Sequence, residues 1–342
     1  MNRNEYNIGF NSYMIKRFSP GNNDILDDEN EIAYHYTSPE AFLSIIQKQT
    51  IRFTDIRYLN DKSEGVYFVK LLLDFIDKNK GAYQYFEEAV NALLKGNTYE
   101  KITSLETTNI EYTEIQYMPY KPVRVFVFCT CSEPDSLNMW NYYVNNSSYQ
   151  GYNIGFKVKE LLKTFNTTDA KKLDSFVVYY GNVLYSEKDQ FNEIRQIAEK
   201  IEKGVAKNAE GGEHSKQRGL HYVQLWLRNY IDSRGAFYKH PKFESEREFR
   251  IVIEISEERI PKVSGNNNFS GFYNKTIFEG FAAKRGLIVP YLNIQFPKDA
   301  ISRITVAPMI EYVIAKSSIK ELLEANRIKG AKIYKSIIPI RF

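Results

Sequence analysis

The clearest alternation of apolar and polar residues lies between positions 244 and 255, and it predicts a β-strand. Successive side chains of a strand point to opposite faces. One face would be apolar and turned to the core, with Phe249, Ile251, Ile253 and Ile255. The other face would carry the charged residues Glu246, Glu248, Arg250 and Glu254. Neighbouring charged side chains would then lie roughly 6–7 Å apart on a rigid element.

This charged face has a chemical and a structural interpretation. Two carboxylates fixed at this spacing suit general acid–base or cation-stabilising chemistry, because one can stay ionised while the pKa of its neighbour is displaced. The alternative without function is a solvated strand face that forms a ladder of cross-strand ion pairs.

The remaining pattern predicts a single α+β domain. Short apolar runs predict strands at residues 32–37, 51–54, 123–129, 151–158, 176–180, 183–185, 301–306 and 332–340. Apolar residues spaced three and four positions apart predict the helices. One helix begins at Pro39, and the others span residues 66–76, 83–94, 159–165, 187–203, 217–232 and 317–326. We expect a flexible arm over residues 1–30, and over residues 31–342 a central, largely antiparallel sheet with peripheral helical insertions.

Charge and cysteine usage favour a cytoplasmic protein without a membrane segment. Residues 1–5 lack the apolar core of a signal peptide, and the longest apolar run, residues 123–131, is too short to cross a bilayer. A net charge of +4 on 46 basic and 42 acidic residues argues against a dedicated polyanion-binding surface. Cys129 and Cys131 stand two residues apart on one predicted strand, so we expect both to be reduced packing residues, with no metal site.

Four segments are candidates for a functional site: Tyr34-His35-Tyr36-Thr37, Asn60-Asp61-x-x-Glu64, Met139-Trp140-x-x-Tyr143 and Glu246-x-Glu248-x-Arg250. Each also has a structural explanation. His35 alone is typical of a buried strand histidine. Asp61 and Glu64 match a capping box at a helix start. Trp140 and Tyr143 have the spacing of a helical core pair.

Taken in this order, the four segments resemble a bacterial family known as domain of unknown function 2971. The turn Ser132-x-x-Asp135-Ser136 before the tryptophan and the C-terminal run of residues 335–342 add to the resemblance. It extends from about Tyr34 to the C-terminus, and residues 79–120 and 187–235 are its least family-like insertions.

A second resemblance, to the ADP-ribosyltransferase fold, implies a chemistry. It rests on a strand with His-x-Thr, a capped helix and a short strand after it. The resemblance implies NAD as the substrate. His35, with Tyr36 and Thr37 beside it, would bind the adenosine ribose of NAD, and Tyr143 or Trp140 would stack on nicotinamide.

The same resemblance implies the catalytic group. Glu248, or Glu246 in its place, would hold the nicotinamide ribose and stabilise an oxocarbenium-like transition state. An arginine, Arg52 or Arg250, would bind the pyrophosphate of NAD through paired hydrogen bonds.

We therefore expect an NAD-cleaving or ADP-ribosyltransferase-like enzyme, a bacterial toxin or anti-phage effector that modifies a nucleic acid or a protein. One alternative is a nucleotide-sensing or protein-interaction module that serves a defence system with a partner protein and without turnover. A second is a metal-dependent nuclease that uses Asp61, Glu64, Glu246 and Glu248. The ADP-ribosyltransferase interpretation assigns no role to a further set of candidate site residues: Asn60, Asp61, Glu64 and Asp135.

Overall fold

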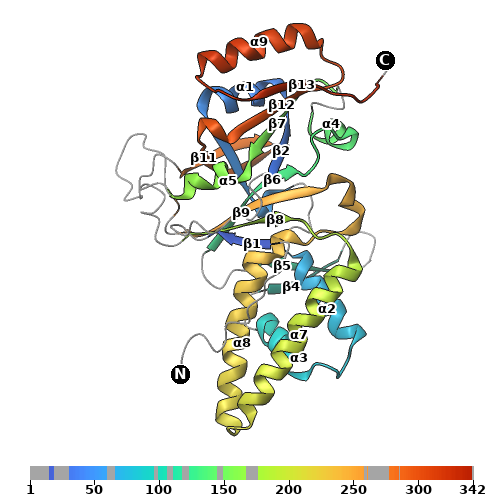
Figure 1. The fold of residues 1–342 in the computed structure, drawn as a ribbon. Coiled ribbons are helices and arrows are strands. Elements are labelled where there is room, and N and C mark those ends of the chain that lie inside the picture. Colours follow the sequence, from blue (N-terminus) through green and yellow to red (C-terminus); the bar gives the residue numbers. More distant parts are fainter. Residues whose placement is uncertain are drawn as a thin grey trace.

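The computed structural model of the chain describes residues 15–18, 31–59, 66–95, 99–105, 111–117, 123–144, 149–166, 176–257, 260, 277–284 and 286–340. In this part of the chain a large sheet lies between a lobe of long helices and the single helix α9 at the opposite end (Figure 1). Nearly all strand pairs are antiparallel, and β12 and β13 form a parallel pair. The predicted α+β class with a largely antiparallel central sheet is confirmed.

The described part of the large sheet contains eleven strands. Eight follow one another in the order β1 (Ile15–Phe18), β8 (Phe176–Asn182), β9 (Glu248–Ser256), β6 (Val123–Cys131), β2 (Ile32–Thr37), β7 (Tyr152–Lys157), β12 (Ile301–Val306) and β13 (Lys332–Lys335). A branch leaves β6 through β3 (Thr50–Asp55), β11 (Leu287–Gln295) and β10 (Ile277–Lys284). Strands β4 (Tyr99–Leu105) and β5 (Glu111–Tyr117) form a separate pair.

The sheet forks at β6. The C-terminal end of β6 pairs with β2 through Cys131 and Tyr34, whereas the middle of β6 pairs with β3 through Val127 and Thr54. Strands β2 and β3 therefore pair with different parts of β6. Helix α1 (Pro39–Lys48) connects β2 to β3. Residues of both arms line the two cavities described below.

Side-chain caps determine where two of the helices begin. In α1, Ser38 accepts a hydrogen bond from the Ala41 amide at 3.3 Å, as expected for the predicted start at Pro39. Helix α9 (Tyr312–Ala325) begins five residues before the predicted residue 317. The Glu311 carboxylate explains the earlier start, because it accepts hydrogen bonds from the Val313 and Ile314 amides at 3.2 and 2.8 Å.

The predicted strand at residues 244–255 is wrong at its N-terminal end. Residues Pro241–Glu246 form a short 3-10 helix, and Arg247 has a left-handed backbone with φ of 41°. Strand β9 begins only at Glu248. Its apolar face packs into the main core as predicted. The opposite face is buried as well, because Val252 packs beside Phe237 and Arg250 is fully buried.

Three further predictions need correction. Residues 176–182 form one continuous strand, β8, which extends two residues beyond the strand predicted at 176–180. Between the predicted helix at residues 83–94 and the predicted strand at residues 123–129, where the pattern predicts no element, the described residues form β4 and β5. Residues 15–18 of the expected arm pair with β8 as strand β1, and the rest of residues 1–30 lie outside the described residues.

The helical lobe has its own hydrophobic core. It consists of α2 (Tyr67–Lys78), α3 (Gln84–Lys95), α7 (Glu187–Ala209) and α8 (Glu213–Arg234), whose buried faces meet around Phe75, Phe86, Ile197 and Leu227. The stretches expected as insertions, residues 79–120 and 187–235, supply α3, α7 and α8. Two short helices lie beside the sheet, α4 (Leu137–Tyr143) and α5 (Val158–Leu162). No helix in the described residues is long and apolar enough to cross a membrane.

Candidate functional site

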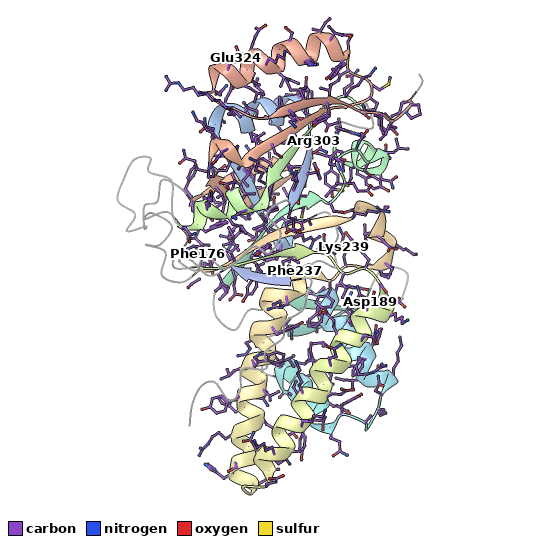
Figure 2. All side chains as sticks on the ribbon, viewed as in Figure 1. Phe176, Asp189, Phe237, Lys239, Arg303 and Glu324 are labelled. Carbon is purple, nitrogen blue, oxygen red and sulfur yellow. The ribbon has the colours of Figure 1, made fainter. Side chains whose placement is uncertain are left out.

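A cavity of about 250 Å³ lies beside the fork and brings three of the four predicted segments together. Its lining includes His35 from β2, Tyr143 from α4, and Glu246 and Glu248 at the start of β9. Lys239 joins them from the segment before the 3-10 helix, and Figure 2 shows it at the level of the sheet, above the helical lobe.

The two carboxylates reach this cavity by different routes. Glu248 is the first residue of β9, and Glu246 is the last residue of the 3-10 helix, so the two do not share a strand face as predicted. The left-handed Arg247 reverses the chain between them. The Arg247 carbonyl accepts a hydrogen bond from the Ser132 amide at 2.9 Å, which fixes the turn against the end of β6.

Buried cations hold both carboxylates. The Lys239 ammonium lies 2.9 Å from Glu246 Oε2 and 2.5 Å from Glu248 Oε1. Arg250 Nε donates to Glu248 Oε2 at 2.6 Å, and Arg250 Nη1 donates to the Ala236 carbonyl at 2.6 Å. A solvated ladder of surface ion pairs is therefore not what this strand forms.

The environment shifts the pKa values of the two carboxyl groups in opposite directions. Burial, together with a hydrogen bond to Glu248, raises the pKa of Glu246 to about 7. Burial also opposes ionisation of Glu248, but the Arg250 guanidinium, the hydrogen bond with Glu246 and the Lys239 ammonium together lower its pKa below the ordinary value. At neutral pH Glu248 is an anion, whereas Glu246 is partly protonated. Paired carboxyls with such different acidity are suited to acid–base chemistry.

Tyr143 and His35 complete the polar lining of the cavity. The Tyr143 hydroxyl donates to Glu246 Oε2 at 3.3 Å, and burial raises the pKa of Tyr143, so the hydroxyl keeps its proton. His35 Nδ1 lies 3.3 Å from the Cys129 carbonyl, which can only accept a hydrogen bond. Burial lowers the pKa of His35 to about 4. The ring is therefore neutral with its proton on Nδ1, and Nε2 keeps a lone pair.

A larger cavity of about 940 Å³ adjoins the first within the fork. His35, Arg52 and Thr54 line both cavities, so the two spaces meet at these residues. The Arg52 guanidinium lies over the Tyr291 ring, 4.6 Å from its centroid, and its side chain is exposed. Thr37 lines the larger cavity only.

Trp140 lies outside the cavities, contrary to its predicted stacking role. Its ring is fully buried, and its Nε1 donates to Asp135 Oδ1 at 2.7 Å. Asp135 also accepts from the Ser336 hydroxyl at 2.8 Å and from the Ile337 amide at 2.8 Å. The predicted site residue Asp135 is therefore structural, because it ties the C-terminal segment to α4.

Two other predicted binding residues have structural partners. Tyr36 lines the small cavity, but its hydroxyl donates to the Glu133 carbonyl and accepts from the Ser136 amide, both at 2.8 Å. Arg250 is fully buried against Glu248, whereas Arg52, the other predicted arginine, is exposed. The remaining candidates, Asn60, Asp61 and Glu64, lie outside the described residues.

Sequence reasoning missed Lys239 and misjudged Cys129. Lys239 is only 5% exposed and bridges both carboxylates, yet nothing in its local sequence marks it. Cys131 is buried as predicted, whereas Cys129 is partly exposed and lines the small cavity. The described residues contain no group of three or more His, Cys, Asp or Glu side chains placed to hold a metal ion.

The arrangement defines a buried site with two hydrogen-bonded carboxyls, next to a larger cavity with which it shares three lining residues. The family model described as "Protein of unknown function (DUF2971)" matches residues 139–251, which include most of α4, helices α7 and α8, and both glutamates. The resemblance to this family is thus confirmed over that part of the chain, which includes residues 187–235, expected from the sequence to be among the least family-like. Comparison with curated proteins and with solved structures returned no match.

Proposed function

We propose that this protein cleaves the N-glycosidic bond of NAD and transfers ADP-ribose to water or to an acceptor on a nucleic acid or a protein. One observation carries the proposal: two carboxyls of opposed acidity share a small cavity with His35 and Tyr143. The resemblance to ADP-ribosyltransferases supplies the substrate, and the cavity supplies groups that suit the reaction.

The two carboxyls would divide the chemistry. Cleavage of the bond between ribose C1′ and the nicotinamide nitrogen leaves positive charge at C1′, and neutral nicotinamide departs with the bonding electron pair. Glu248, which stays ionised, would stabilise that charge. The incoming oxygen of the acceptor then bonds to C1′, and Glu246 would take its proton as general base.

The two cavities together offer room for a dinucleotide, since binding sites of this kind typically span ~300–1,000 Å³. The nicotinamide riboside end would occupy the small cavity, and the adenosine end the larger one. Arg52 lies where the cavities meet, so its guanidinium would bind the pyrophosphate. At the same junction, the lone pair of His35 Nε2 would accept a hydrogen bond from a ribose hydroxyl.

The proposed setting is the cytoplasm of a bacterial cell, where the enzyme would act as a toxin or an anti-phage effector. The free cysteines Cys129 and Cys131 suit a reducing compartment. The toxin or defence role itself rests on the family resemblances.

One observation favours the alternative of a nucleotide-binding module without turnover. Both carboxylate oxygens of Glu248 are engaged by cations, Oε1 by Lys239 and Oε2 by Arg250. Such pairing reduces the net negative charge that Glu248 presents to C1′. The same pairing gives no support to a nuclease, because the two cations occupy the oxygens that a metal ion would need.

Release of nicotinamide from NAD tests the proposal. Wild-type protein should release nicotinamide, and Glu246→Gln and Glu248→Gln should each lower the rate by about 100-fold or more. Glu244→Gln is the matched control, because Glu244 is an exposed carboxylate in the same 3-10 helix as Glu246. Binding of NAD without any release by the wild type would contradict the enzyme and leave the binding module.

A further inference from the structure

The backbone around Lys239 is fixed to the chain segment that precedes α7. Leu184 and Tyr238 form a parallel β-bridge. The Lys239 amide donates to the Leu184 carbonyl at 3.2 Å, and the Leu184 amide donates to the Phe237 carbonyl at 2.8 Å. The side chain of Lys239 therefore projects from a backbone whose position is set at the junction of sheet and helical lobe.

Gln190, in the first turn of α7, joins the two strands of this bridge. Its side chain is fully buried, and Nε2 donates to the Leu184 carbonyl at 2.7 Å and to the Lys239 carbonyl at 2.9 Å. The Tyr67 hydroxyl of α2 donates to Gln190 Oε1 at 3.2 Å and so fixes which way the amide faces. In Figure 2 the neighbouring Asp189 marks this turn of α7, below Lys239.

Tyr238, next to Lys239, is anchored in the helical lobe. Its ring is buried against Phe68 of α2, with 4.3 Å between the ring centroids. Its hydroxyl donates to the Glu193 carboxylate of α7 and lies 3.3 Å from the Tyr230 hydroxyl of α8. Three helices of the lobe thus hold one short segment that ends in the candidate site.

We propose that Gln190 is a positioning residue, which places the Lys239 ammonium between the Glu246 and Glu248 carboxylates and thereby couples the helical lobe to the candidate active site. The positioning rests on the contacts above. Its consequence for turnover rests on the proposed function, in which Glu246 takes the proton of the acceptor.

A change in the position of Lys239 has a direct electrostatic readout. The Lys239 ammonium lowers the pKa of Glu246 and so opposes the effect of burial. The charged and titratable groups that line the cavity with Glu246 come from seven parts of the chain: Tyr34, His35, Tyr36, Arg52, Cys129, Tyr143, Lys239, Glu248, Arg250 and Lys284. If the ammonium moves away while these other groups stay in place, the pKa of Glu246 must rise.

The test compares Gln190→Leu with Gln196→Leu, which changes an exposed glutamine of the same helix. Tyr67→Phe is a milder variant that removes the hydroxyl donor to the Gln190 amide and keeps the ring. The titration of Glu246 is followed by carbon-13 NMR of labelled glutamate carboxyls, assigned with Glu246→Gln. Release of nicotinamide from NAD is measured on the same samples.

Gln190→Leu and Tyr67→Phe should raise the titration midpoint of Glu246, and Gln196→Leu should leave it unchanged. Gln190→Leu should also lower kcat for NAD by about 10- to 100-fold with KM little changed, because a displaced group loses its alignment in the transition state. If Gln190→Leu does not fold, Tyr67→Phe decides by the same titration.

An unchanged Glu246 titration in folded Gln190→Leu, or in Tyr67→Phe where Gln190→Leu does not fold, would overturn the positioning role. Equal shifts in the Gln196→Leu control would overturn it too. A wild type that releases no nicotinamide, but whose Glu246 titration responds to Gln190, would refute the proposed function and keep the positioning role.

Discussion

Glu248→Gln should cost the protein stability as well as activity. The Glu248 side chain is 2% exposed and lies between Lys239 and Arg250, which are themselves buried. Removing one partner of a buried ion pair typically costs ~3–5 kcal/mol, because the remaining charge loses its compensation. The glutamine oxygen still accepts one hydrogen bond, so we expect the lower end, about 3 kcal/mol.

Thermal unfolding of Glu248→Gln, beside the control Glu244→Gln, measures this cost. A loss of about 3 kcal/mol corresponds to a fall in Tm of roughly 5 °C or more in a chain of this size. Glu244→Gln, at an exposed position, should stay within about 0.5 kcal/mol of the wild type. A solvated Glu248, as the strand pattern alone predicts, would tolerate the substitution. An unchanged Tm would therefore refute the buried charge cluster.

Activity separates the structural role of Glu248 from a catalytic one. Below the transition temperature of the variant, where both proteins are folded, Glu248→Gln should release nicotinamide about 100-fold more slowly than the wild type or worse, about 3 kcal/mol in the barrier. Wild-type rates in the folded variant would show that Glu248 only supports the fold.

Three further outcomes follow from the site. Nicotinamide release should rise with pH through about 7 as Glu246 loses its proton, and Glu246→Gln should abolish this rise; a rise that persists in the variant would assign the titration to another group. Iodoacetamide should alkylate Cys129 and spare the buried Cys131, and NAD should slow the reaction; alkylation of Cys129 at the same rate with saturating NAD would place the ligand elsewhere. Asp135→Asn should lower the free energy of unfolding by about 1–3 kcal/mol through weaker hydrogen bonds to Trp140 and Ser336, without changing the turnover of folded protein. A loss of turnover in folded protein would indicate that Asp135 acts in the functional site.

Local sequence signals explain why parts of the fold were predictable. The Ser38 cap and the spacing of Phe42, Ile45 and Ile46 act within one helix, so they placed α1 correctly. The alternation from Phe249 onward likewise assigned the core face of β9. These features depend on neighbours along the chain, which a sequence displays directly.

The site depended on contacts between distant residues. Arg247 adopts a left-handed backbone where its turn meets Ser132, and this removes Glu246 from the strand that its alternation suggested. The fork forms because β6 pairs with both β2 and β3, and no residue in the sequence of β6 indicates this double pairing. Lys239 enters the site because Gln190 and Glu193, nearly fifty residues earlier in the chain, hold the segment around it.

Aromatic spacing could not separate Trp140 from Tyr143. Both lie on α4, and their spacing of three residues fits a core pair and a ligand-stacking pair equally well. The distinction comes from Asp135, which holds the indole inside the protein, while Tyr143 faces Glu246. One of the two predicted alternatives for the stacking ring is thereby removed.

The most direct test of the account is the crystal structure of Glu246→Gln with NAD, in which slow turnover should preserve the bound dinucleotide. We expect nicotinamide in the small cavity, ribose C1′ within about 4 Å of the Glu248 carboxylate, and the pyrophosphate beside Arg52. NAD bound away from Glu248, or both cavities empty at saturating NAD, would contradict the assignment of this site to NAD cleavage.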